Sequence, residues 1–342
     1  MRTALLLLAL SLCAYAADKK GAAGQINTFG PGATAVSRSV EDKLRERVSV
    51  KDYGAKGDAH AETDNAIVSG DKTFTNTYPK FAASDVGKTI YVSGAGVSGA
   101  DLVTTIASFT SNASIELTDA AATTVTGAQA VWGSDDTAAF NAALAAATTS
   151  RRAMFVPDGN YILTDQIYAA YDPHWGNYGA DLVGAGSKST FLYFPSTFNL
   201  TRTGVIHGLG EQTISGLTLS FSQPDTATRG NLIAYPPAIY CATGCSAWKL
   251  KDLRFYRAST AIKCAAGCPG MTIDDVNMSA FTEGIFIDQT YDVVKLSNIH
   301  YWIGFGLTAN QQAIVATSPS AGFRRHQYTT AGRPACDSTP IP

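Results

Sequence analysis

Three consecutive segments share one pattern at 23-residue spacing: AIYCATGCSAWKLKDLRFYRAST from Ala238, AIKCAAGCPGMTIDDVNMSAFTE from Ala261 and GIFIDQTYDVVKLSNIHYWIGF from Gly284. Apolar residues recur at the same place in each segment and alternate with polar ones, as in short strands. A fixed period in the twenties built from strands is typical of a solenoid, in which each repeat packs on the next. The aligned sets are Ile239, Ile262 and Ile285; Leu250, Ile273 and Leu296; Leu253, Val276 and Ile299; and Phe255, Met278 and Tyr301.

Composition and charge exclude several classes of function. Charged residues make up 16% of the 342 residues, 31 residues are glycine, and the formal net charge is −2. Nucleic-acid binding and membrane-surface binding both favour a basic face, which this balance does not supply. Low charge with abundant glycine and small polar residues suits a β-rich secreted protein.

The N-terminus has the features of a secretory signal peptide. Arg2 precedes an apolar run to Cys13, and Ala14-Tyr15-Ala16 fits the small-x-small rule for cleavage after Ala16. The run is too short to span a bilayer, although an N-terminal anchor is the alternative. We therefore expect a secreted or periplasmic protein.

Five cysteines remain after cleavage, and four of them form two C-x3-C pairs in neighbouring repeats. An oxidising compartment permits disulfides. The bonds could run within each repeat or between repeats, and a reduced buried stack is a third alternative. Zinc binding is disfavoured because no histidine follows at ligand spacing. The five are Cys241, Cys245, Cys264, Cys268 and Cys336.

The chain divides by composition into several parts. A Gly/Ala-rich and then charged lead precedes the first strand, and a Thr/Ser/Val-rich segment with short strands interrupts the solenoid. The periodic pattern fades after Leu307, which suggests a truncated or non-native tail. The expected parts are a signal peptide at 1–16, a flexible lead at 17–46, a parallel β-helix at 47–59 and 132–314, an inserted β domain at 60–131 and an irregular C-terminus at 315–342.

A helix is predicted between the insert and the first strand pair. Ala138 to Ala147 has high helix propensity, and Ser134 or Asp135 is the expected N-cap. Asp135 and Asp136 then lie in the first turn, where the helix dipole stabilises carboxylates, so we interpret the pair as structural. The Gly184-Ala-Gly186 run lacks the helix and Gly-Lys of a phosphate-binding loop.

Three motifs together resemble the pectate-lyase superfamily of parallel β-helix proteins, which includes polygalacturonase-like and rhamnogalacturonase-like enzymes and many tailspikes. They are VSVKDYGAKGD from Val48, SDDTAAFNAALAAA from Ser134 and MFVPDGNYILT from Met154. The resemblance implies an all-β fold, a right-handed parallel β-helix solenoid with an N-terminal capping helix. The insert after Asp58 departs from the family pattern, although tailspike-like members carry similar inserts.

Strand alternation predicts which side chains face outward. The first external column contains Arg254, Asn277 and His300, and the second contains Tyr256, Ser279 and Trp302. Aromatic faces and hydrogen-bonding groups in adjacent columns could hold a polysaccharide, so the expected substrate-binding residues are Arg254, Tyr256, Asn277, His300 and Trp302. The alternative is a solvated face, or one covered by a loop or another subunit.

Candidate catalytic residues are carboxylates that break their repeat columns. Glycoside hydrolysis usually needs two carboxylates around the scissile bond, and Asp274 and Asp288 are the two candidates. Asp252 and Asp275 instead share a turn position with Gly216 and Asn298, and we interpret them as a structural turn ladder. Of the polygalacturonase motifs only an Asp-Asp is present, so the resemblance identifies no catalytic set.

The expected function is a secreted polysaccharide-active enzyme, a hydrolase or lyase, acting on an acidic glycan such as pectin. The alternative is a non-catalytic glycan-binding module of tailspike or adhesin type, which could form a homotrimer. No cofactor is expected, although Ca²⁺ is possible if the protein is a lyase, and a calcium-dependent lyase would need clustered carboxylates. The expected partner is a polysaccharide, and neither nucleic acid nor a membrane.

Overall fold

The computed structural model describes residues 46–316 except 79, 169–178, 209, 243–245, 266–267, 291, 303 and 305, together with strands at 27–28, 38–39, 323–328 and 334–335. The predicted signal peptide lies outside the described residues, as does the lead, apart from β1 (Asn27–Thr28) and β2 (Arg38–Ser39), which pair antiparallel. The chain separates into two units, Met1–Val48 and Ser49–Pro342.

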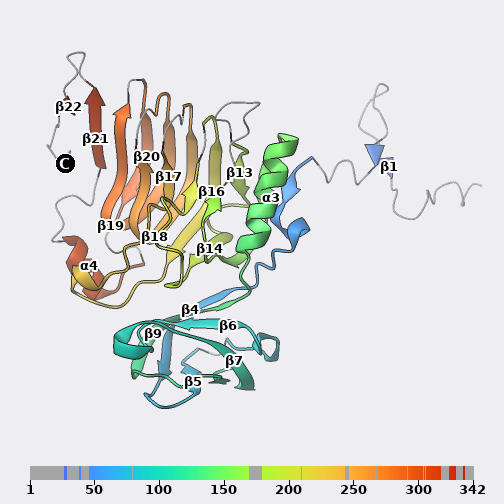
Figure 1. The fold of residues 1–342 in the computed structure, drawn as a ribbon, viewed down its shortest axis with the longest axis vertical. Helices are drawn as coiled ribbons and strands as arrows, with labels where there is room; N and C mark the ends of the chain where they lie inside the picture. Colours follow the sequence, from blue (N-terminus) through green and yellow to red (C-terminus); the bar gives the residue numbers. More distant parts are fainter. Residues whose placement is uncertain are drawn as a thin grey trace, which may run out of the picture. The chain divides into compact units, whose positions relative to one another are not determined.

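A large parallel sheet dominates the second unit, with β13 (Leu182–Gly184), β16 (Thr213–Phe221), β18 (Lys249–Cys264), β19 (Thr272–Thr290) and β20 (Lys295–Tyr301) stacked one after another (Figure 1). β10 (Met154–Val156) pairs in parallel with β13 and precedes it in the stack. Hydrogen-bonded parallel strands at every step are consistent with a β-helix and confirm an all-β architecture.

The predicted stacking of the repeats is confirmed by the register. Ile239 pairs with Ile262, and Ile262 pairs with Ile285, and the three side chains are at most 2% exposed. Leu250 pairs with Ile273, which pairs with Leu296. Each buried side chain therefore lies directly on the equivalent side chain of the next coil. Leu296 keeps this register but is 37% exposed, because among the described strands β20 pairs only with β19.

Two further sets of strands complete the coils. β11 (Gly159–Ile162) pairs with β14 (Thr190–Phe194), which pairs with β16. β12 (Ile167–Tyr168) pairs with β15 (Ile206–His207), then β17 (Ile239–Cys241), and then the end of β18. All of these pairs are parallel. β18 and β19 are long because each runs continuously through successive bends of one coil.

One bend repeats as a column of left-handed residues. Gly216, Asp252, Asp275 and Asn298 have φ of 70°, 50°, 51° and 52°. Glycine, asparagine and aspartate are the residues that best tolerate this conformation. The Asp252 carboxylate also accepts hydrogen bonds from the amide and hydroxyl of Ser187. The predicted turn ladder is thus present, and Asp252 has a structural role within it.

Residues from His60 to Gly133 form a closed six-stranded barrel with its own core. Its strands are β4 (His60–Ile67), β5 (Thr73–Asn76), β6 (Thr89–Val92), β7 (Leu102–Ser111), β8 (Ser114–Leu117) and β9 (Val125–Gly133). Phe74, Ile90, Ile115 and Trp132 are fully buried inside it. Closure pairs both edges of the sheet, so no strand is left as a free edge.

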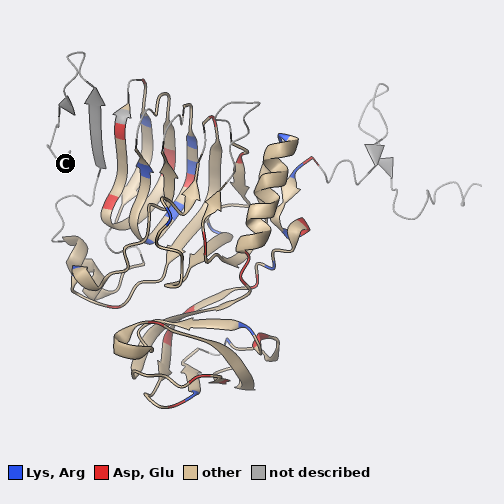
Figure 2. Ribbon diagram, viewed as in Figure 1, with Lys and Arg blue, Asp and Glu red and all other residues tan. Residues whose placement is uncertain are grey.

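Helix α3 (Thr137–Ser150) follows the barrel, and the predicted run 138–147 lies within it. Its N-cap is Asp136, one residue after the later of the two expected caps. The Asp135 carboxylate still accepts the amide of Thr137, as the cap prediction expects, and it also accepts the hydroxyl of Thr164, whereas the side chain of Asp136 makes no capping hydrogen bond. Figure 2 shows the body of α3 without charged residues, and Phe140, Ala143, Leu144 and Ala147 are buried.

Shorter elements complete the described chain. They are β3 (Val48–Ser49), the 3-10 helices η1 (Val50–Tyr53), η2 (Ala83–Asp85), η3 (Val97–Gly99) and η4 (Arg229–Asn231), and α4 (Ala309–Ala316). β21 (Phe323–Tyr328) pairs in parallel with β19, and β22 (Pro334–Ala335) pairs antiparallel with β21, in a segment for which the sequence predicts no further rung. The rest of the predicted irregular C-terminus lies outside the described residues. No helix in the described part is both long and apolar enough to cross a membrane.

Candidate functional site

The first predicted external column is aligned across three strands. Arg254 of β18 pairs with Asn277 of β19, which pairs with His300 of β20. The flanking residues Leu253 and Phe255 are fully buried, which directs the intervening side chain outward. Nδ1 of His300 lies 3.3 Å from Oδ1 of Asn277, so these two outward groups already contact each other.

The second predicted column is not an open platform. Ser279 is 0% exposed, and its hydroxyl accepts from the amide of Arg257 at 3.1 Å. The prediction that Ser279 faces solvent was therefore wrong. The reason lies in the pairing of β18 with β19, because the register shifts between Phe255 and Ala258, and Arg257 has a φ of 59° there. The Arg257 guanidinium donates to the carbonyl of Gly306 at 3.1 Å, and a Cβ on Gly306 would overlap the ring of Tyr256.

Trp302 remains accessible at the end of the second column. It is 53% exposed, and its indole stacks on the His300 ring with centroids 6.1 Å apart and an interplanar angle of 6°. His300 and Trp302 thus form a small aromatic surface beside Asn277. The structure brings together four of the five expected binding residues on one face and leaves Tyr256 half-buried beneath Gly306.

Asp274 is held as an ionised carboxylate. Its Oδ1 accepts from the hydroxyl of Ser297 at 2.7 Å and from the side-chain amide of Asn298 at 3.0 Å. These two bonds, that of Ser297 first, hold the pKa of Asp274 below its ordinary value. A general acid in glycoside hydrolysis needs a raised pKa so that it carries a proton at working pH. This environment therefore does not suit Asp274 for proton donation.

Asp288 lies on a different run of the coil. Asp274 precedes the left-handed bend at Asp275, whereas Asp288 follows Ile287 near the end of β19. Between them the pairing of β18 with β19 is also irregular, around Ala258 and Ala280. The two carboxylates proposed as a catalytic pair are thus separated by two interruptions of the coil, and the structure does not join them into one site.

A continuous outward ladder runs along the coils on the face that carries Asp288. Tyr168, His207, Tyr240, Lys263 and Phe286 are successive register partners across five strands. Each follows one residue of the buried isoleucine file that begins at Ile167. The sequence interpretation missed this ladder because only its last three members have the 23-residue spacing, whereas loops lengthen the earlier coils.

The members of this ladder contact one another. The ring of His207 lies 4.9 Å from that of Tyr168 and 5.6 Å from that of Tyr240, between their centroids. Nζ of Lys263 lies 5.4 Å from the centroid of the Phe286 ring, within the range of a cation–π contact. Burial lowers the pKa of His207, so its imidazole is neutral near pH 7. The ladder therefore carries one cation, Lys263 at its fourth position, between Tyr240 and Phe286.

The ladder is bordered by small residues. Ala242, Ala265 and Asp288 follow the inward residues Cys241, Cys264 and Ile287 by one position, so alternation directs them to the ladder's side of the strand. Asp288 is thus the predicted catalytic carboxylate that shares a face with the ladder.

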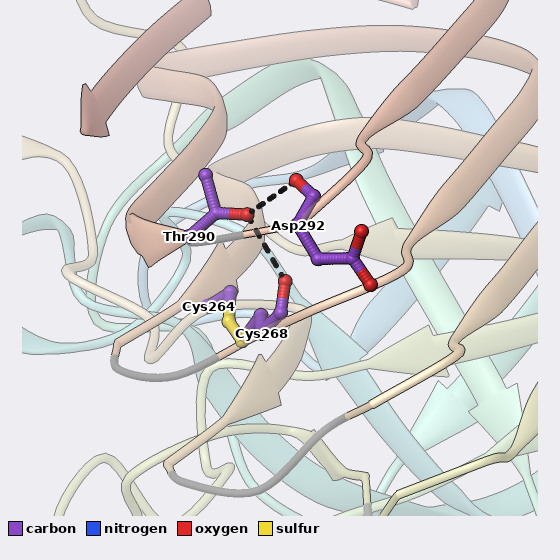
Figure 3. Close-up of a disulfide and its surroundings, with 4 residues drawn as sticks. All are labelled: Cys264, Cys268, Thr290 and Asp292. Carbon is purple, nitrogen blue, oxygen red and sulfur yellow. Dashed lines mark hydrogen bonds between the residues drawn. A yellow bond between two sulfur atoms is a disulfide. The ribbon is translucent and has the colours of Figure 1, made fainter. Parts of the chain in front are cut away.

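The turn that follows this face is closed by a disulfide between Cys264 and Cys268 (Figure 3). The hydroxyl of Thr290 contacts the carbonyls of Cys268 and Asp292 at 3.3 and 3.2 Å (Figure 3). The within-repeat alternative is confirmed for this pair. Cys241 is also disulfide-bonded, whereas Cys245 and Cys336 lie outside the described residues. Although Cys241, Cys264 and Cys268 cluster, bonded sulfurs are not the thiolates that a metal requires.

The carboxyl of Asp136 also has a shifted pKa, but its role is structural. In the part of the chain that the structure describes, Asp136 is the only carboxyl whose pKa is clearly raised, and desolvation is the main cause. Its two oxygens accept the amides of Lys56 and Gly57 at 2.6 and 3.1 Å. This confirms that the carboxylate of Asp136 fixes the start of α3 against the loop after η1.

Comparison with known families gives one match. Residues 124–216 match the family described as rhamnogalacturonase A/epimerase, pectate lyase-like. No significant match is found among curated proteins or among solved structures. The matched segment includes α3 and the first parallel strands, and it confirms the resemblance seen in the sequence motifs. It ends before Arg254, Asp274 and Asp288, so it assigns no role to these residues. It supports a role on pectin-related polysaccharides.

Proposed function

We propose that this chain, which matches pectate lyase-like proteins over residues 124–216, binds an acidic polysaccharide such as pectin along the ladder Tyr168–His207–Tyr240–Lys263–Phe286. The ladder itself is the observation that carries this proposal. Parallel strands are about 4.8 Å apart, so five aligned side chains form an extended surface that suits a linear polymer lying parallel to the solenoid axis.

The ladder residues have complementary chemistry for an acidic glycan. Aromatic rings can pack against the apolar faces of sugar rings, and the ammonium of Lys263 can pair with a uronate carboxylate. The neutral imidazole of His207 can exchange hydrogen bonds with hydroxyl groups. The methyl groups of Ala242 and Ala265 leave space for the polymer beside the rings.

The column Arg254–Asn277–His300 and the adjacent Trp302 are proposed as a second contact region for the same class of glycan. Arg254 and His300 supply nitrogen donors, and Trp302 supplies an exposed aromatic face. Tyr256 is a weaker candidate because Gly306 packs on its ring. This region is shorter than the ladder, so we assign it a secondary role.

Binding without cleavage is better supported than catalysis. Asp274 has a lowered pKa, and it lies on a different run of the coil from Asp288. The hydrolase or lyase function expected from the family is therefore the second candidate, with Asp288 as its proposed catalytic carboxylate. A calcium-dependent lyase fits less well, because the only metal-type cluster among the described residues is the cysteine set.

The proposal also includes the context of the molecule. We propose that α3 caps the first coil, that the barrel of residues 60–133 is an inserted module, and that the protein is secreted or periplasmic. Buried Phe140 and Leu144 support the cap. The disulfide between Cys264 and Cys268 supports an oxidising compartment. A homotrimer remains the proposed assembly for a tailspike-like protein.

The test measures binding and cleavage separately. The protein is titrated with polygalacturonate, rhamnogalacturonan and a neutral glucan, and each mixture is then assayed for new reducing ends and unsaturated sugars. The expected result is binding to the acidic glycans that weakens with salt and is lost in Lys263→Ala. Lys249→Ala, an exposed lysine at the start of β18, is the matched control. Equal binding by both variants would reject the ladder as the site.

A further inference from the structure

The sequence contains three Asn-x-Ser/Thr triplets, at Asn112, Asn199 and Asn277. This triplet is the acceptor for N-linked glycosylation when it is exposed in a secreted protein. The structure separates the three by the state of their side chains. We propose that Asn112 is an N-glycosylation site and that Asn199 and Asn277 are not.

Asn112 lies at the turn between β7 and β8, where Ser111 pairs with Ser114 across the hairpin. Its backbone is held firmly, because its carbonyl oxygen accepts the amides of Lys80 and Phe81 at 2.7 and 2.9 Å. Its side chain is exposed, and the described part of the chain records no hydrogen bond to it. A glycan on this amide would extend into solvent without displacing any contact of the barrel.

In the two other triplets, the asparagine side chain already contacts other side chains. Oδ1 of Asn199 accepts from the amide and hydroxyl of Thr201 at 3.2 and 2.7 Å, and its side chain also bonds Asp165. Oδ1 of Asn277 contacts His300 within the stacked strands, and the hydroxyl of Ser279 is fully buried. A glycan at Asn277 would lie between Arg254 and His300 and obstruct the adjacent strands.

The modification requires an activated sugar donor, an oligosaccharide linked through a diphosphate to a polyprenyl lipid. Nδ2 of Asn112 attacks the anomeric carbon of that donor. The new C–N bond forms as the C–O bond to the diphosphate breaks, the amide loses one proton, and the lipid diphosphate leaves. The hydroxyl of Ser114 at the third position completes the acceptor triplet.

This inference depends on the proposed secretion but not on glycan binding. The full chain with its own N-terminus is expressed in a eukaryotic secretory cell, and medium and cells are digested with peptide N-glycosidase. The expected result is secreted protein that loses the mass of one glycan and carries aspartate at position 112. Asn112→Gln and Ser114→Ala should each abolish the shift, and Asn277→Gln should leave it unchanged.

The possible results distinguish failure of the proposed glycosylation site from failure of the proposed secretion. Secreted protein without an enzyme-sensitive mass overturns the site alone, as does a shift that survives in both Asn112→Gln and Ser114→Ala. Chain retained in the cytosol in unmodified form overturns both secretion and the site. Circular dichroism of the secreted variants establishes whether each substitution leaves the fold intact.

Discussion

Asp58 and Ser134 are 76 residues apart in the sequence, yet the carboxylate of Asp58 accepts the amide of Ser134 at 3.0 Å and its hydroxyl at 3.3 Å. The chain therefore leaves the barrel close to the point where it enters the barrel. This contact rejoins the two halves of the N-terminal motif that resembles pectate-lyase superfamily proteins. Lys88 of the barrel lies 3.0 Å from the same carboxylate and adds an ion pair.

Asp58→Asn should weaken this junction in a pH-dependent way. Burial alone would raise the pKa of Asp58, but the bonds from Ser134 and the Lys88 ammonium outweigh it and the pKa is lowered. The stabilisation is thus present above the pKa of the unfolded chain and lost as pH falls through the folded value. We expect the variant to lose about 1 kcal/mol of unfolding free energy at pH 7.

Urea denaturation of the wild type and Asp58→Asn from pH 7 to pH 3 provides the measurement. The difference in unfolding free energy should shrink towards the acid end, because protonation of Asp58 removes the same charge. Asp52→Asn, an exposed carboxylate in η1, serves as the control. A constant difference across the pH range would contradict the assignment.

The isoleucine file should contribute strongly to stability. Ile262 is fully buried between Ile239 and Ile285, so Ile262→Ala should cost about 3 kcal/mol through lost burial and a residual cavity. Leu296→Ala is the matched comparison, and its cost should be smaller because Leu296 is 37% exposed. Equal costs in urea denaturation would show that the file is not a packed core.

Tyr240→Ala tests the aromatic part of the ladder. Loss of one stacking ring should weaken polygalacturonate binding by about 1 kcal/mol, or about fivefold in Kd, measured by calorimetry. Tyr53→Ala is a suitable control because Tyr53 is exposed but belongs to η1. A fivefold loss in the control as well would mean that the effect is not specific to the ladder.

Replacing each of the two predicted catalytic carboxylates with asparagine should affect cleavage differently. Asp274→Asn is expected to leave reducing-end release unchanged, because its carboxylate is bonded to Ser297 and Asn298 and lies on a different part of the coil from Asp288. Where cleavage of an acidic glycan is detected, Asp288→Asn should lower it at least tenfold, since Asp288 shares the face of the ladder. Loss of turnover in Asp274→Asn alone would reverse this assignment.

Breaking the disulfide should loosen one turn without unfolding the solenoid. The Cys264→Ala/Cys268→Ala double variant should lose about 2 kcal/mol, as expected for closure of a very short loop. Thermal unfolding with and without reductant measures the change. Mass mapping of the unreduced wild type should recover a peptide that links Cys264 to Cys268, and a peptide linking Cys264 to Cys241 would contradict this pairing.

The 23-residue period predicted most of the coil geometry because it is a one-dimensional property. Stacked parallel strands place equivalent positions over one another, so aligned letters such as Ile239, Ile262 and Ile285 become aligned side chains. The same reasoning located the left-handed turn column of Asp252 and Asp275, whose short polar residues tolerate positive φ. These features depend only on neighbouring repeats.

Contacts between distant parts of the chain could not be predicted from the repeat period. The sequence alone determined that the aligned aliphatic residues lie inward, where the turns fall and which columns align, because each coil packs on the coil before it. Only the tertiary structure decided that Ser279 is buried, that Asp274 and Asp288 lie on different runs, and that Tyr168 and His207 extend the ladder. Those relationships depend on loops of unequal length and on contacts between strands, and a local repeat period does not predict them.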